Sequence, residues 1–347
     1  MIAFLVDGNS HIGMGHMMRC MCIADALVNM GKDILFILSP DSDVQSIKRG
    51  TFNVIKMPKS GNQGWDLQEA LKTIRLNNVS LLVIDSYRIM LNDFTEFKKN
   101  TKVIYLDDLY TYNADVNAII NCNIDSRSEP YNAACVSGRK VFTGAGYFPL
   151  RQEFAGYKNA SLRQAVKSVL ITTGSTDPCK CAAQIIKTVP INDYPGILFK
   201  ILLGKYYPDD YVDYLKMNCI DLGNIKFVEW GRNIAKTISE SDVVISSGSS
   251  TVFESLSLNV PCITFQFAEN HNAECVELDR LGMAPWAGIY GSVHDVETND
   301  CLRNLFMKEL EYEVRLEQCK VYTPVFDGGG LQRIIKIICE MEVSPEF

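Results

Sequence analysis

The chain has 347 residues, 47% of them hydrophobic, with a formal net charge of −7 and a pI near 5.3. That length exceeds what one hydrophobic core usually serves, so we expect two domains. The acidic balance argues against nucleic acid or an anionic membrane as a partner. No apolar run approaches the roughly 20 residues of a bilayer span, so we expect a cytoplasmic protein.

Twelve cysteines are scattered along the chain, many of them within apolar runs. The close pairs Cys20/Cys22 and Cys179/Cys181 are separated by one residue, whereas zinc knuckles and redox motifs use two. Because the chain has only four histidines, we expect reduced structural cysteines, no metal and no other cofactor.

Short β-branched runs alternate with helical stretches, which is typical of parallel α/β sheets. The first half is expected to contain strands over 2–6, 33–37, 53–55, 81–84, 102–106, 118–121 and 140–143, and helices over 16–30, 67–76 and 91–98. After a connector at 148–162, we expect strands over 168–172, 197–203, 225–229, 242–246 and 261–265, and helices over 180–187, 208–217, 233–239, 251–258 and 272–281. A helical tail covers about 302–320 and 330–341. The pattern predicts two Rossmann-like domains with parallel sheets, 1–155 and 156–347, and a ligand cleft between them at the carboxyl ends of the strands.

The segment from Asp7 to His16 leads from the first strand into the first helix and contains Gly13 and Gly15. These glycines permit tight turns, and the free N–H groups of the helix start attract phosphate or developing negative charge. The helix dipole disfavours a cationic imidazole there, so His16 is the candidate general base. A surface histidine at a helix cap fits the same pattern. Arg19, one turn later on the same side, either reaches a phosphate or braces the loop.

Polar residues follow two further strands of the first half, where ligands of α/β proteins bind. Tyr87, in the run from Ile84, either contacts a sugar or packs as a half-buried tyrosine. Asp107 and Asp108 have the same placement after the next strand, and either bind a ligand or cap local backbone.

Small polar loops follow strands of the second half as well. Gly174 and Ser175 can offer N–H and hydroxyl donors to a diphosphate, although turn chemistry alone explains them equally well. Ser249 and Ser250 open a helix, and Glu254 lies one turn inside it, within reach of a ribose. The alternative is a serine-rich cap with a surface glutamate.

Asn270 and His271 follow the last expected strand of the second half. They either meet the sugar and phosphates or cap the helix that comes next.

Gly13-x-Gly15-His16-x-x-Arg19 resembles the motif of UDP-2,4-diacetamido-2,4,6-trideoxy-β-L-altropyranose hydrolases, a family of pseudaminic acid biosynthesis. Blocks similar to that family follow in the same order, over roughly residues 1–290, at 84–87, 106–108, 174–177, 249–254 and Asn270. The second half also looks like the donor-binding half of the UDP-GlcNAc transferase that makes lipid II, a glycosyltransferase of the GT-B fold. Position 175 is Ser where many relatives have Gly, and position 86 is Ser where some have His.

The resemblance implies a metal-independent hydrolase of GT-B architecture. It would remove UDP from a diacetamido-trideoxy sugar by water attack at the anomeric carbon, with inversion. His16 would be the base or its positioner, Tyr87 and Asn270 would contact the sugar and diphosphate, and Glu254 would pair with the ribose of UDP.

Three alternatives stay open: a GT-B glycosyltransferase with a UDP-sugar donor, a UDP-sugar-binding module without turnover, and a UDP-sugar 2-epimerase. We expect a small-molecule UDP-sugar as substrate and neither nucleic acid nor membrane as partner. A monomer fits the sequence, which does not fix the oligomeric state.

Overall fold

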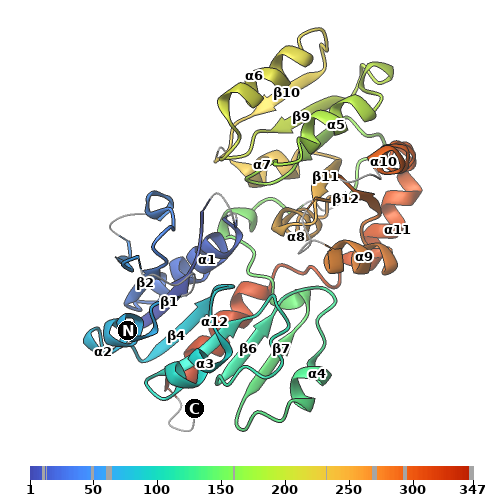
Figure 1. Ribbon diagram of the computed structural model, residues 1–347. Coiled ribbons are helices and arrows are strands. Elements are labelled where there is room, and N and C mark those ends of the chain that lie inside the picture. The colour runs from blue at the N-terminus through green and yellow to red at the C-terminus, as the bar shows by residue number, and fades with distance from the viewer. Residues whose placement is uncertain are drawn as a thin grey trace. The chain divides into compact units, whose positions relative to one another are not determined.

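The computed structural model describes residues 1–9, 12, 14–47, 51–59, 65–158, 161–231, 233–267, 272–291 and 295–343. The chain divides into two compact units. Unit 1 holds Met1–Arg151 and Gly328–Phe347, and unit 2 holds Gln152–Asp327. Each unit is built around a parallel β-sheet with helices on both faces (Figure 1).

In the described part of unit 1, seven parallel strands form a sheet of order β3-β2-β1-β4-β5-β6-β7. The strands are β1 (Ile2–Val6), β2 (Ile34–Leu38), β3 (Asn53–Lys56), β4 (Leu81–Asp85), β5 (Lys102–Leu106), β6 (Ala118–Asn121) and β7 (Lys140–Thr143). Strands β1, β2 and β4 are buried along their whole length. Their uninterrupted apolar sequences follow from that position, because a parallel sheet is covered on both faces.

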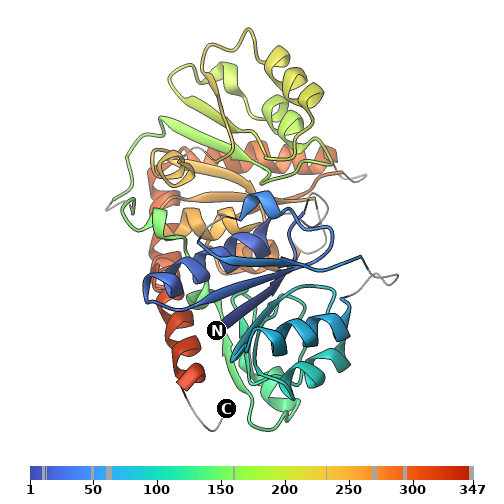
Figure 2. The same ribbon diagram turned by 90° about the vertical axis from the view of Figure 1, so that its left-hand side faces the viewer.

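Two sets of helices cover this sheet. Unit 1 contains α1 (Gly15–Asn29), α2 (Leu67–Leu76), α3 (Leu91–Lys98), α4 (Ser128–Ala133) and α12 (Gly330–Val343). Helices α2 and α3 pack their apolar residues, among them Leu71 and Phe94, with Leu5 and Ile84 of the sheet. Helix α1 packs against β1 and β2, and α12 lies beside α1 and against β5 (Figure 2).

In the described part of unit 2, six parallel strands form a sheet of order β10-β9-β8-β11-β12-β13. They are β8 (Ser168–Thr172), β9 (Leu198–Leu202), β10 (Ile225–Val228), β11 (Val243–Ser247), β12 (Cys262–Gln266) and β13 (Trp286–Ile289). The helices are α5 (Cys181–Thr188), α6 (Asp209–Asn218), α7 (Ile234–Ser239), α8 (Ser250–Ser257), α9 (Asn272–Arg280), α10 (Asp295–Glu309) and α11 (Tyr312–Tyr322). One core joins the sheet to α5, α6 and α10 and includes the fully buried side chains of Phe199 and Phe306.

The predicted fold class, two Rossmann-like domains with parallel sheets, is confirmed. The observed division differs from the expected 1–155 and 156–347 in two respects: the first segment of unit 1 ends at Arg151, and α12 belongs to unit 1. Its start is held closely there: a Cβ on Gly330 would lie 2.0 Å from the Phe148 carbonyl oxygen. The expected tail helix over 302–320 is two helices, α10 and α11, and β13 and α4 were not expected.

Within the described ranges, none of the helices has both the length and the apolar character needed to cross a bilayer. The twelve cysteines all lie within the described ranges; they form no disulfide with one another, and seven of them are buried.

Candidate active site

Four polar side chains from three elements meet at the carboxyl edge of the sheet in unit 1. Strand β4 lies between β1 and β5, so the residues that end these strands are neighbours. Asp85 is the last residue of β4 and aligns with Val6 of β1. Asp108 follows β5 by two residues, and His16 and Arg19 come from the first two turns of α1. We call these four residues the His16 cluster.

His16 and Asp85 form a buried pair. The Nδ1 atom of His16 lies 2.5 Å from Oδ1 of Asp85, with 7% of the imidazole and none of the carboxylate exposed. An ionised carboxylate only accepts hydrogen bonds, so in the neutral imidazole Nδ1 carries the proton and Nε2 keeps its lone pair. Within the described residues, the polar contacts of His16 all engage Nδ1. The alternative of a surface histidine therefore does not describe this residue.

Arg19 is held by two carboxylates. Its Nε and Nη2 donate to Asp85 at 2.6 and 2.5 Å. Its Nη1 donates to Asp108 Oδ1 at 2.9 Å, and Nη2 lies 2.9 Å from Asp108 Oδ2. Three of the five N–H donors of the guanidinium thus donate to carboxylates of the protein, so the contacts match the bracing role more closely than the phosphate-binding role.

The charges around His16 set its basicity. Burial lowers its pKa, but the charge and hydrogen bond of Asp85 outweigh burial, and the pKa lies above the ordinary 6.5. Arg19 lowers this pKa and Asp108 raises it. The helix dipole favours a neutral imidazole. The carboxylate of Asp85, which lies 69 residues away in the sequence, outweighs that effect. Burial raises the pKa of Asp85, but Arg19 and His16 hold it well below its usual range.

Tyr87 covers the pair from the loop after β4. Its ring meets the imidazole edge-on, with the centroids 4.4 Å apart and the planes at 90°. The side chain is 36% exposed. Tyr87 thus packs against His16 and still presents part of its ring to solvent, so the predicted sugar contact stays a prediction.

A second buried network lies beside the cluster, around Ser86. The indole Nε1 of Trp65 and the backbone N–H of Arg88 both donate to Ser86 Oγ, at 2.8 and 3.1 Å. The hydroxyl proton of Ser86 therefore goes to Oδ2 of Asp7. The other oxygen of Asp7 is buried without a partner among the described residues.

Asp107, adjacent to Asp108, has a local role. Its carboxylate accepts from the backbone N–H groups of Leu109 and Thr111 and from the Tyr131 hydroxyl, at 2.9, 2.7 and 2.7 Å. The capping alternative thus describes Asp107, whereas Asp108 pairs with Arg19 and its predicted ligand contact stays a prediction.

One set of metal-type donors exists among the described residues, formed by His16, Asp85 and Asp108 within 4.8 Å of one another. The guanidinium of Arg19 lies 2.5 and 2.9 Å from the two carboxylates. It already supplies the positive charge that a cation would bring. The donor set therefore does not fit a resident metal unless Arg19 leaves.

In unit 2, the loops after β8 and β11 are joined at the carboxyl edge of the sheet. Ser246 aligns with Thr172, and the Ser247 hydroxyl donates to the Thr173 carbonyl oxygen at 3.1 Å. Gly174 has a φ of +87°, which favours glycine. Ser175 accepts from the Tyr206 N–H at 2.9 Å through its carbonyl oxygen.

The start of α8 carries a hydroxyl with no hydrogen-bond partner among the described residues. Ser249 precedes the helix in an extended conformation and makes no capping hydrogen bond. Its Oγ is buried and unpartnered in the described part of the chain, as is Oε1 of Gln266 at the end of the adjacent β12. A ligand or water that bonds to these two buried atoms would satisfy them, as buried polar atoms in native proteins usually are. Sequence reasoning missed Gln266, although its place after an apolar strand was a usable signal.

Of the remaining residues predicted to contact the substrate, three are described by the structure and three are not. Ser250 is exposed at the first position of α8, and Glu254 is buried one turn later. Gly15 opens α1, and a Cβ there would meet no atom within 4 Å, so the protein itself does not require glycine. Gly13, Asn270 and His271 lie outside the described residues.

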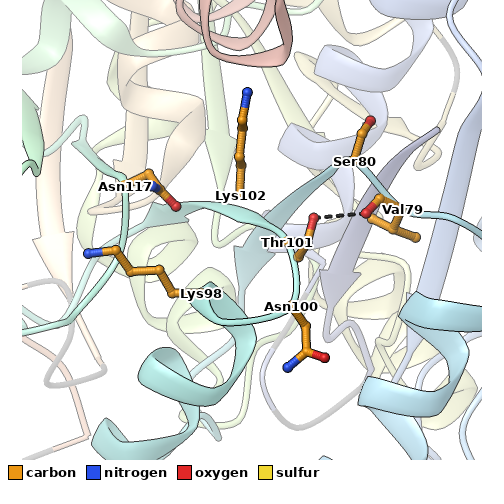
Figure 3. Close-up of a pocket in the computed structure, with 7 residues that line it drawn as sticks. All are labelled: Val79, Ser80, Lys98, Asn100, Thr101, Lys102 and Asn117. Atoms are coloured by element: carbon orange, nitrogen blue, oxygen red, sulfur yellow. Dashed lines mark hydrogen bonds between the residues drawn. The ribbon is translucent and has the colours of Figure 1, made fainter. Parts of the chain in front are cut away.

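A hollow of about 320 Å³ lies elsewhere in unit 1 (Figure 3). It is lined by Val79, Ser80, Lys98, Asn100, Thr101, Lys102 and Asn117. These residues stand at the amino ends of β4, β5 and β6, opposite the edge where parallel sheets bind ligands. Lys98 is paired with Asp115 at 2.6 Å, Lys102 donates to the Met341 carbonyl oxygen, and the two side chains extend in different directions. The hollow is therefore not the candidate site.

The sequence comparisons bear on the resemblance to the sugar-nucleotide hydrolases. The chain is 24% identical over 287 residues to the UDP-2,4-diacetamido-2,4,6-trideoxy-β-L-altropyranose hydrolase of Campylobacter jejuni, covering 81% of this chain and 97% of that one. The predicted resemblance is confirmed. The chain is also 22% identical over 350 residues to the spore coat polysaccharide biosynthesis protein SpsG of Bacillus subtilis, and the match covers 98% of both chains. No protein-family model matches the chain.

A third relative is an uncharacterized protein of Methanocaldococcus jannaschii, 26% identical over 294 residues. The match covers 80% of this chain and 57% of that protein. The chain thus spans little more than half of this relative.

Solved structures share the two-unit fold. MurG of Acinetobacter baumannii superposes with a TM-score of 0.66 at 12% identity, over 98% of this chain and 99% of that one. A UDP-GlcNAc 2-epimerase of Neisseria meningitidis, bound to UDP-GlcNAc, gives 0.64 at 14% identity, over 98% and 100%. The chain therefore has the GT-B fold of these two structures.

Proposed function

We propose that the protein is a hydrolase that releases UDP from a UDP-2,4-diacetamido-2,4,6-trideoxy sugar, in nonulosonic (pseudaminic) acid biosynthesis. The His16–Asp85 pair is the observation that carries the proposal, because it holds an imidazole with Nδ1 bonded and Nε2 unengaged by described residues. The 24% identity to an enzyme with that name supports the choice of substrate. The cytoplasmic location and the monomeric state stay predictions.

In this reaction, Nε2 of His16 takes a proton from water as the water oxygen attacks the anomeric carbon. The bond between that carbon and the UDP oxygen breaks, its electron pair leaves with UDP, and the sugar configuration inverts. Asp85 accepts from Nδ1, which fixes the tautomer and stabilises the imidazolium that forms. Asp85 stays ionised throughout, since Arg19 donates to both of its oxygens.

Unit 2 would hold the diphosphate. The hydroxyl of Ser249 and the N–H groups in the first turn of α8 are donors suited to a phosphate. The loop at Gly174 would add backbone donors, and Glu254 would pair with the ribose. In this proposal, hydrogen-bond donors rather than a metal stabilise the charge of the departing UDP.

An acceptor-free assay tests this function. The purified protein is incubated with the UDP-diacetamido sugar, and UDP is measured by chromatography. We expect UDP release, and we expect His16→Asn to reduce turnover by about 10²–10⁴, the usual contribution of a general base. Release that begins only after an acceptor is added would indicate a glycosyltransferase. UDP binding without turnover of any UDP-sugar would indicate a binding module, and a 2-epimer in the product NMR spectrum an epimerase.

A further inference from the structure

The carboxylate of Asp108 contacts two charged or titratable side chains, those of Arg19 and His16. Within the described residues, its carboxylate pairs with Arg19 through both oxygens at 2.9 Å, and Oδ2 lies 3.9 Å from Nδ1 of His16. No backbone N–H is among these partners, in contrast to Asp107, which caps its own loop. With 17% of its side chain exposed, Asp108 is partly shielded from solvent. The contacts of Asp108 are thus electrostatic, and they are made with other members of the His16 cluster.

A count of charges shows what Asp108 contributes. With a neutral imidazole, Arg19 brings one positive charge and the two carboxylates bring two negative charges, so the cluster carries −1. When His16 accepts a proton, the cluster becomes neutral. Without Asp108 the same step would take the cluster from 0 to +1 in a buried place, where an uncompensated charge is costly.

We propose that Asp108 is a positioning residue that neutralises Arg19, so that the guanidinium can hold Asp85 against His16 without repelling the proton that the imidazole must accept. The catalytic consequence rests on the proposed hydrolysis, whereas the electrostatic effect on His16 does not. A bracing arginine next to a general base would otherwise weaken that base, and the second carboxylate removes the conflict.

Among the residues that the structure describes, the other groups that face the imidazole bring no competing charge. Tyr87 contributes an aromatic edge from the loop after β4. Cys20, on the next turn of α1, donates its thiol to Asp85 at 3.3 Å. Burial raises the pKa of the Cys20 thiol well above its usual range, so the thiol stays neutral. Asp85 and Arg19 are then the charges that act on His16 together with Asp108.

An NMR titration of the full-length protein without substrate tests the proposal. The chain has four histidines, so the imidazole signal of His16 is assigned by its loss in His16→Asn. We expect Asp108→Asn to lower the midpoint of the His16 titration by about 1 pH unit or more, as the loss of a nearby opposite charge does. Asp108→Glu should restore the midpoint to within about half a pH unit, because the charge returns.

A matched control removes the same charge elsewhere. Asp115→Asn takes a carboxylate from the Lys98 pair in the same unit, and we expect it to leave the midpoint unchanged. If Asp108→Asn does not fold, Asp108→Ser removes the same charge and is titrated instead. A His16 midpoint that is equal in the parent and the neutral variant would overturn the proposal.

Kinetics separate this proposal from the proposed function. If the parent releases UDP, the acid limb of kcat/KM should move down with the His16 midpoint in Asp108→Asn. If the parent releases no UDP, the hydrolase assignment fails, and the titration still decides the electrostatic role of Asp108.

Discussion

Asp85 accepts a hydrogen bond from Nδ1 of His16 at 2.5 Å, across 69 positions of sequence. The two residues meet because β4 pairs with β1, so that its last residue reaches the loop that leads into α1. The pair combines a fixed tautomer with a buried negative charge, which is what an imidazole needs to act as a base.

Replacing Asp85 by Asn should impair catalysis nearly as strongly as loss of the base. An amide can present its N–H to Nδ1 and thereby place the imidazole proton on Nε2, the wrong nitrogen for water activation. We expect turnover to fall by about 10²–10⁴, measured as UDP release at saturating substrate. Asp115→Asn, which removes an acid that pairs with Lys98, is the control and should retain parental turnover. Parental turnover in Asp85→Asn would rule out this pair as the catalytic base.

The rate should depend on pH through His16. Because the His16 pKa is raised above 6.5, the imidazole is protonated and inactive as a base over more of the acidic range. We expect kcat/KM to rise with pH through a midpoint above 6.5 and then to level off. A pH series of UDP release measures this midpoint. A midpoint well below 6.5 would show that another group supplies the base.

Gly204→Ala should disturb the predicted diphosphate loop without touching His16. A Cβ at Gly204 would lie 2.6 and 2.7 Å from the carbonyl oxygens of Gly174 and Ser175, so the loop must move. We expect the affinity for UDP, measured by calorimetry, to fall about tenfold, which is close to 1.4 kcal/mol. Gly196→Ala is the matched control, because a Cβ there meets no atom within 4 Å. Unchanged UDP affinity in Gly204→Ala would remove the loop from the nucleotide site.

Glu309 makes the stability of unit 2 depend on pH. It is buried at the end of α10, and Gln318 donates to its Oε1 at 2.5 Å. Burial raises its pKa to about 7, although Gln318 and Arg315 act in the opposite direction. Since the folded-state pKa lies above the unfolded value near 4.5, the contribution of Glu309 is full below pH 4.5 and is lost as the pH rises to about 7.

Glu309→Gln keeps the acceptor for Gln318 and removes this dependence. We expect the variant to gain up to about 3 kcal/mol of unfolding free energy over the parent between pH 5 and pH 8. Thermal unfolding at the two pH values checks the sign. An equal difference in Tm at both values would mean that Glu309 ionises normally.

Much of the fold could be predicted from the sequence, because the elements carry clear local signals. Strand β6 was expected at the bounds observed, 118–121, since its apolar run has polar flanks. Strand β13 was missed because it is short, irregularly paired, and contains Gly288 with a φ of +121°. The periodicity of α12 predicted a helix, but periodicity does not say which sheet an apolar face will cover.

The site could be predicted only in part. The spacing of His16 and Arg19 on one helix placed them on the same side, as the structure has them. Their partners Asp85 and Asp108 stand 69 and 89 residues away from the residues they bind. These contacts follow from the order β1-β4-β5, which the sequence alone does not specify.

Hydrolysis in H₂¹⁸O tests the central claim most directly. The products of the UDP-diacetamido sugar are analysed by mass spectrometry before the label exchanges, with His16→Asn run in parallel. We expect the heavy oxygen at the anomeric position of the released sugar, unlabelled UDP, and little product from the variant. Label in UDP, or undiminished product from His16→Asn, would contradict water attack at the anomeric carbon by a His16-activated water.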